Sequence, residues 1–161
     1  LAANILCQLP RELRNRIHTF CVQGSYDNNV IVRRASRSES VFALLTRQCL
    51  CHHSYRWVED PTQLIISAQV LGQELGREMV EAYYWTRTFK FTHRELSLLA
   101  PFLSTDRFGL GMIPACYARR IQIQFQPGIA VVSEEKQYLQ ALEILGAMLT
   151  ARTEVIIDIE L

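Results

Sequence analysis

Three short segments in the second half of the chain alternate polar and apolar residues, and this pattern limits the possible folds more than any other feature. They span residues 88–92, 119–125 and, apart from Ile156, 154–161. Alternation with a period of two is typical of a strand that buries one face. A helical pattern separates successive strands, and such crossover connections favour parallel pairing. The sequence therefore predicts an α/β fold with a mostly parallel sheet.

The helices between these strands are indicated by their start signals and by leucine stripes. Thr92 and Glu95 have the spacing of a capping box, and Leu96, Leu99 and Leu103 form the stripe that follows. The second helix is predicted to open at Ser133 with two acidic residues. Its apolar stripe is predicted to comprise Leu139, Leu142, Leu145 and Leu149.

Apart from Ile156, the outward positions of the three predicted strands are polar. A parallel sheet with helices on both faces has nearly continuous apolar strands, so we expect helices on one face only. This arrangement resembles a leucine-rich-repeat solenoid and leaves the other face open to solvent or to a partner. The last strand ends as an apolar edge, which we expect further chain or a partner to cover. The predicted protein-binding residues of the open face are Lys90, Arg120, Gln122, Gln124, Asp158 and Glu160.

A short amphipathic helix is predicted near the beginning of the chain. Pro10 suits its first position, because the ring presets φ and the missing N–H would have no partner there. Leu13, Ile17 and Phe20 recur on one face. The alternative is that this is the ordinary first helix of a globular domain. The solvent side is predicted to carry Arg11, Arg14 and Asn15.

The region that follows is the least regular part of the sequence. Residues 25–59 are predicted to be an irregular, loop-rich insert, in which 30–34 fits a short strand and 41–51 fits a short helix or strand. From Asp60 the pattern becomes helical, with Asp60 as an N-cap and Pro61 in the first turn. One long helix is predicted from there to Ala82. We therefore expect one domain over 1–161, made of a helix at 5–24, the insert, and an α/β platform at 60–161.

Charge and cysteine content argue against several classes of protein. The net charge of +1 lacks the basic excess from which nucleic-acid and membrane-surface binders gain affinity, so neither partner is expected. Five cysteines, an odd number, do not fit a secreted disulfide framework and favour a cytoplasmic or nuclear protein. No apolar run approaches the ~20 residues that a membrane span requires.

Little catalytic chemistry is evident in the sequence. Cys49, Cys51, His52 and His53 form a cluster of metal-ligand types, but no second ligand pair follows at the spacing of a structural zinc site. We find no Gly-x-Ser-x-Gly elbow, no phosphate-binding Gly-Lys-Ser/Thr loop and no His-Glu-x-x-His motif. The sequence therefore predicts no enzyme, no cofactor and no metal site, and an enzyme would rest on this cluster alone.

Two stretches resemble fungal F-box-like proteins. The first is Leu9-Pro10-x-Glu12-Leu13-Arg14-Asn15-x-Ile17. The second runs from Leu64-Ile65-Ile66-Ser67-Ala68-Gln69-Val70 through Ala82-Tyr83-Tyr84 to Thr88-Phe89-Lys90-Phe91, and a strand with a basic start follows at 119–123. The resemblance implies an F-box-like helix, followed by an α/β platform for a substrate or partner. The residues that it implies for docking a Skp1-like linker are Leu9, Pro10, Leu13 and Ile17.

These observations lead us to expect a non-enzymatic protein-interaction adaptor or scaffold. The resemblance suggests F-box-like substrate recognition in a ubiquitin-ligase complex or a nuclear regulatory complex. The alternative is a fungal effector or a self-associating structural domain without a ubiquitin link, which a homodimer interface would favour.

Overall fold

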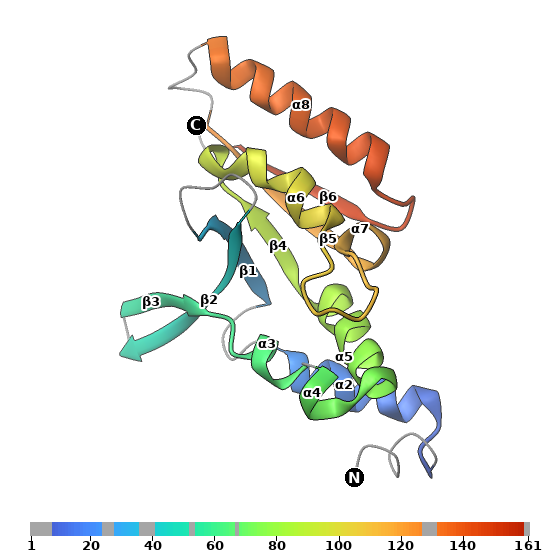
Figure 1. Cartoon of the computed structure of the whole chain (residues 1–161). Coiled ribbons are helices and arrows are strands. Elements are labelled where there is room, and N and C mark those ends of the chain that lie inside the picture. Colours follow the sequence, from blue (N-terminus) through green and yellow to red (C-terminus); the bar gives the residue numbers. More distant parts are fainter. Residues whose placement is uncertain are drawn as a thin grey trace.

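The computed structural model describes residues 8–23, 28–35, 41–51, 54–66, 68–126 and 132–159. These residues form a six-stranded sheet in the order β3–β2–β1–β4–β5–β6, with helices packed against it (Figure 1). Three of the five strand pairs are parallel. The predicted α/β class with a mostly parallel sheet is therefore confirmed.

The parallel part of the sheet contains the three strands predicted from alternation. They are β4 (Thr88–Phe91), β5 (Arg120–Phe125) and β6 (Glu154–Ile159), paired in that order. Phe89 lies beside Ile121, which lies beside Val155, so the apolar positions of neighbouring strands share one face. Glu160 lies outside the described residues.

The other part of the sheet takes the place of the irregular insert predicted at 25–59, and it includes the short strand expected at 30–34. Its described residues form β1 (Asn29–Arg34), β2 (Phe42–Cys51) and β3 (Ser54–Glu59). Strand β1 pairs parallel to β4, and β2 and β3 continue from it as an antiparallel meander. The buried side chains of this part are Val30, Val32, Phe42 and Leu44. A repeat architecture like that of leucine-rich-repeat proteins stays a prediction.

Both predicted crossover helices are present, but the type and capping of the first and the buried face of the second differ from the prediction. The first is a 3-10 segment, η1 (His93–Leu98), that continues into α6 (Leu99–Ser104), and Thr92 forms no side-chain capping bond. The second, α8 (Val132–Met148), buries Tyr138, Ala141 and Leu145. Leu139 and Leu142 of the predicted stripe are exposed instead. The ring of Tyr138 packs 4.0 Å from that of Phe125, which fixes how the helix is rotated on the sheet.

The long helix expected after Asp60 is broken into three. They are α3 (Thr62–Ile65), α4 (Ala68–Leu71) and α5 (Gln73–Thr86). Gly72 separates the last two with φ of +77°, a conformation that other residues rarely adopt. A further short helix, α7 (Pro114–Tyr117), precedes β5.

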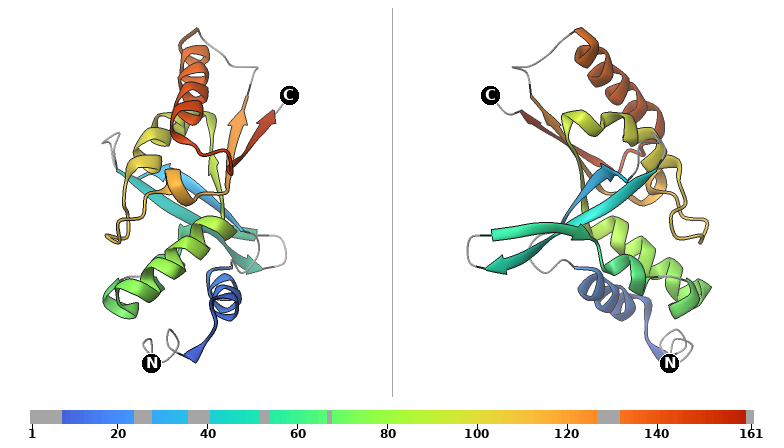
Figure 2. Two further views of the ribbon diagram at one scale, coloured as in Figure 1. Left: turned by 90° about the vertical axis from the view of Figure 1, so that its right-hand side faces the viewer. Right: turned by 60° about the vertical axis from the view of Figure 1, so that its left-hand side comes forward.

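The predicted N-terminal helix is α2 (Arg11–Val22), and it packs along α5. Pro10 is its N-cap rather than its first helical residue, and its carbonyl oxygen accepts bonds from the N–H groups of Leu13 and Arg14, both at 3.1 Å. Figures 1 and 2 show α2, α3, α4 and α5 gathered at one end of the molecule, with α8 at the other. The helical end thus carries the residues that are predicted to dock a partner.

Aromatic rings fill the core where α5 and α6 meet the sheet. Phe89 lies 5.8 Å from Tyr83, 5.7 Å from Tyr84 and 4.9 Å from Phe102, measured between ring centroids. Burial raises the pKa of Tyr83 well above its ordinary value of 10.0, and neighbouring Asp60 adds to this, so its hydroxyl stays a donor. This cluster holds α5 in place, and α5 in turn supports α2.

Candidate protein-interaction surfaces

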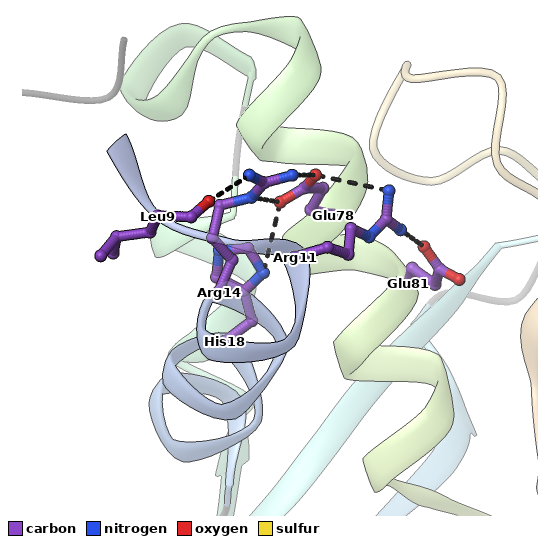
Figure 3. A network of polar contacts seen from close by, with 6 residues as sticks. All are labelled: Leu9, Arg11, Arg14, His18, Glu78 and Glu81. Carbon is purple, nitrogen blue, oxygen red and sulfur yellow. Dashed lines mark hydrogen bonds and ion pairs between the residues drawn. The ribbon is translucent and has the colours of Figure 1, made fainter. Parts of the chain in front are cut away.

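Helix α2 is attached to α5 by its charged face. Arg14 donates two hydrogen bonds to the Glu78 carboxylate, from Nε at 2.9 Å and from Nη2 at 2.8 Å (Figure 3). Its Nη1 donates a third to the carbonyl oxygen of Leu9, at 2.7 Å. This forked geometry is the strong form of a carboxylate–guanidinium pair. The bonds from Arg14 lower the pKa of Glu78, so the carboxylate remains ionised in neutral solution.

Arg11 extends the same contact toward solvent. Its Nη2 lies 2.8 Å from Oε2 of Glu81, and its Nη1 lies 3.5 Å from Oε1 of Glu78. Half of the Arg11 side chain is exposed, so this pair contributes less than the shielded bond of Arg14. Arg11 and Arg14 were predicted to lie on the solvent side of α2. Instead they hold α2 against α5.

His18 lies one helical turn after Arg14 and is buried. Its Nδ1 is 3.8 Å from Oε2 of Glu78, too far for a hydrogen bond. Burial lowers the pKa of His18 below its ordinary value of 6.5, and the attraction of Glu78 only partly opposes this shift. The imidazole is therefore neutral when α2 is in place.

We expect the free energy of unfolding to fall as the pH decreases from about 7 to about 5. In this window the unfolded chain binds a proton at His18 more readily than the folded chain does, so acid favours unfolding. Glu78 stays ionised throughout because its pKa is lowered from 4.5. Urea denaturation of wild type and His18→Gln at both pH values measures the effect. A variant that retained the full pH dependence would contradict it.

The apolar face of α2 is exposed at the surface. Leu13 is 46% exposed, Ile17 is 43% exposed and Phe20 is 80% exposed. Of the other residues predicted for docking, Pro10 is exposed and Leu9 is half-buried. The face at positions 13, 17 and 20, which we call the α2 apolar stripe, is thus at the surface. The neighbouring helices carry further exposed apolar side chains, at Leu64, Ile65, Val70 and Trp85.

The predicted open face of the sheet forms a second surface. It holds a hollow of about 440 Å³ lined by residues from all six strands and by Thr92. Four of the predicted residues line it, namely Lys90, Gln122, Gln124 and Asp158. Gln122 donates a bond from Nε2 to Oδ2 of Asp158 at 3.1 Å, which ties β5 to β6. We call this surface the sheet hollow.

Arg120, at the start of β5, does not line the sheet hollow. It lines a groove between α2 and α5 with Phe20 and Trp85, and its Nη2 donates to the carbonyl oxygen of Thr86 at 3.2 Å. Because β5 begins at Arg120, this side chain reaches the helical end rather than the middle of the sheet.

One wall of the sheet hollow is aromatic, and the sequence did not predict it. The guanidinium of Arg47 lies 4.2 Å from the ring centroid of Tyr55 and 5.5 Å from that of Trp57. Strands β2 and β3 pair Arg47 with Trp57, so the three side chains share one face. Alternation of Tyr55 and Trp57 within β3 is the signal that could have found them. Such a cation–π group fixes the arginine beside an apolar surface.

The Cys/His cluster lies mostly outside the described residues. His52, His53 and the side chain of Cys51 belong to the undescribed part, whereas Cys49 contacts the carbonyl oxygen of Ser54, with its Sγ 3.7 Å away. Among the residues that the structure describes, no three His, Cys, Asp or Glu side chains gather as metal ligands. None of the described helices is both long enough and apolar enough to cross a membrane.

The described surfaces combine amide, charged, aromatic and aliphatic groups in shallow, open settings. Such surfaces suit the recognition of another chain, with apolar anchors and a polar rim. In the comparison with known proteins, no family model, no curated protein and no solved structure matches this chain.

Proposed function

We propose that this protein is a non-enzymatic interaction adaptor in which α2 docks a Skp1-like linker and the sheet hollow receives a second protein. The observation that carries the proposal is the orientation of α2. Its charged face is fixed to α5 through Arg14 and Glu78, while Leu13 and Ile17 face solvent. The resemblance to F-box-like proteins supplies the class of partner, and a ubiquitin-ligase complex or a nuclear regulatory complex is the proposed setting.

The energetics of exposed apolar residues support a docking role. Fully burying a leucine or isoleucine side chain stabilises a complex by about 1.5–3 kcal/mol relative to leaving it in water. Leu13, Ile17 and Phe20 follow the i, i+4, i+7 spacing by which one helix fits an apolar groove of another protein. Because Arg14 already fixes the helix, little further ordering is required on binding.

The decisive test is binding of a purified Skp1-like protein by isothermal titration calorimetry. Leu13→Asp/Ile17→Asp is expected to weaken binding at least 100-fold, because two apolar anchors become charged. The matched control is Asn15→Asp/Thr19→Asp. It also introduces two aspartates four residues apart, but on another exposed face of α2. This control is expected to bind like wild type. Circular dichroism checks that both variants fold.

Equal binding by wild type and Leu13→Asp/Ile17→Asp would contradict the docking role of α2. No binding by the wild type would remove the Skp1-like partner from the proposal. If instead the wild type were a dimer that Leu13→Asp/Ile17→Asp dissociates, the self-associating domain would replace the adaptor. Partners retained by the folded double variant would be assigned to the sheet hollow.

A further inference from the structure

Strand β6 ends the sheet, and its outer edge pairs with no other described strand. The main-chain N–H and C=O groups along that edge are therefore available to an incoming strand. Its pairing with β5 is continuous, from Arg120 beside Glu154 to Phe125 beside Ile159. The edge extends over six residues and contains no proline, lysine or bulge.

The opposite edge of the sheet is protected in ways that β6 is not. Strand β3 pairs with β2 through an irregular register between Cys49 and Cys51. It also carries Arg56, whose Nε donates to Oε1 of Gln48 at 2.8 Å. Bulges and charged side chains are the usual devices by which a free edge avoids pairing. Strand β6 has no bulge and no basic side chain, and its charges are those of Glu154 and Asp158, which a strand carrying lysine or arginine would complement.

An apolar groove adjoins the free edge of β6. It has a volume of about 150 Å³ and lies between α8 and the sheet, where Phe125, Tyr138 and Leu142 contribute to its lining. Ile157 is 52% exposed and Ile159 is 57% exposed, and both open into this groove. A strand added beside β6 would place every second side chain on this face, next to Leu142.

The other face of β6 is acidic. Glu154 and Asp158 are both exposed, and neither forms an ion pair with a described residue. An incoming strand with lysine or arginine at its alternate positions would place these cations opposite the carboxylates. A partner strand therefore needs aliphatic residues at the positions that face the groove. It needs basic residues at the alternate positions, which face Glu154 and Asp158.

We infer that β6 and the adjoining groove bind an extended segment of a partner polypeptide in which aliphatic residues alternate with lysine or arginine. A second copy of this chain fits less well. Pairing two β6 strands so that their apolar faces match would place Glu154 and Asp158 of both copies on the same opposite face. Four carboxylates would then lie together, and like charges across a strand pair are destabilising. This surface is separate from α2, so the inference does not depend on the proposed docking role.

The test is fluorescence anisotropy of a labelled octapeptide with alternating valine and lysine. It is expected to bind the wild type at least tenfold more tightly than a peptide with glutamate in place of lysine. Ile157→Lys should lower the affinity at least tenfold, because it places a charge in the groove. Glu154→Lys/Asp158→Lys should reverse the preference between the two peptides. Both variants change exposed residues and are checked by circular dichroism.

A peptide with identical side chains and N-methyl groups on alternate residues distinguishes strand addition from simple charge attraction. N-methylation along the pairing edge removes the N–H donors and should abolish binding. Equal binding of the methylated peptide, or of the lysine and glutamate peptides, would overturn the inference. So would a wild-type dimer in sedimentation analysis that Ile157→Lys dissociates, because the occupant would then be a second copy.

Discussion

Replacing Asp60 with alanine is expected to lower the free energy of unfolding by about 3–5 kcal/mol, the cost typical of removing one partner from a buried ion pair. Asp60 is buried and joins three other groups. Its Oδ2 accepts from the hydroxyl of Tyr83 at 2.9 Å and lies 3.6 Å from Nη2 of Arg87, while its Oδ1 accepts from the N–H of Thr62 at 3.1 Å. Arg87 also donates to Oγ1 of Thr62 at 3.1 Å. The variant would remove the carboxylate from beside a buried guanidinium.

Urea denaturation followed by circular dichroism measures this loss. Glu59→Ala is the matched control, since it removes an exposed carboxylate from the neighbouring position and should change the free energy of unfolding by less than about 0.5 kcal/mol. Asp60→Asn keeps the shape but not the charge, and its cost should be smaller than that of Asp60→Ala. Equal stability of Asp60→Ala and Glu59→Ala would show that the buried network does not hold the end of β3 against α5.

Replacing Phe89 with alanine is expected to cost about 3–5 kcal/mol, as for other large-to-small changes of a buried ring. Phe89 is fully buried and contacts the rings of Tyr83, Tyr84 and Phe102. Its loss leaves a cavity where β4, α5 and α6 meet, and the surrounding rings can fill that space only in part. The measurement is again urea denaturation, compared at one temperature with wild type.

Phe20→Ala is the control for Phe89→Ala, and it also tests the orientation of α2. Phe20 is 80% exposed, so its removal should change stability by less than about 0.5 kcal/mol. If the two substitutions cost the same, Phe20 would have to be buried, and the α2 apolar stripe would not be at the surface. The pair of variants thus connects core packing to the proposed docking face.

The strands of the parallel part could be predicted because their signal is local. At β4, β5 and β6, apolar residues alternate with polar ones within four to six residues, and each strand lies where the alternation does. Strand β1 coincides with the short strand expected at 30–34, whereas β2 and β3 lie in the segment predicted to be an irregular insert, since they lack a continuous apolar pattern. Their conformation depends on cross-strand pairing, for example of Arg47 with Trp57, which a single sequence does not reveal.

The helix boundaries and buried faces also depend partly on local sequence and partly on tertiary contacts. Leucine spacing predicted one helix after Asp60, yet Gly72 adopts positive φ and starts α5 anew. In α8 the helix itself was predictable, but the face turned inward carries Tyr138 rather than Leu139 and Leu142. Contact of Tyr138 with Phe125 selects that face, because the aromatic pair buries more apolar area than a leucine could.

The candidate surfaces were predictable only in part. Polar outward positions indicated an open sheet face, and Lys90, Gln122, Gln124 and Asp158 do line one hollow. Arg120 belongs to another groove because it begins its strand at the helical end. Glu160 lies outside the described residues. The aromatic wall of Arg47, Tyr55 and Trp57 required the register of β2 and β3 to be known.

The sequence by itself determined which segments are helix and which are strand wherever one periodic pattern repeats within a few residues, as in α2 and β4 to β6. It also determined that α2 has a charged face and an apolar face. The tertiary structure decided which of these faces turns inward. Glu78 and Glu81 lie 64 and 70 residues beyond their partners Arg14 and Arg11, and only folding brings them together. Those ion pairs hold the charged face against α5, so Leu13, Ile17 and Phe20 are left at the surface.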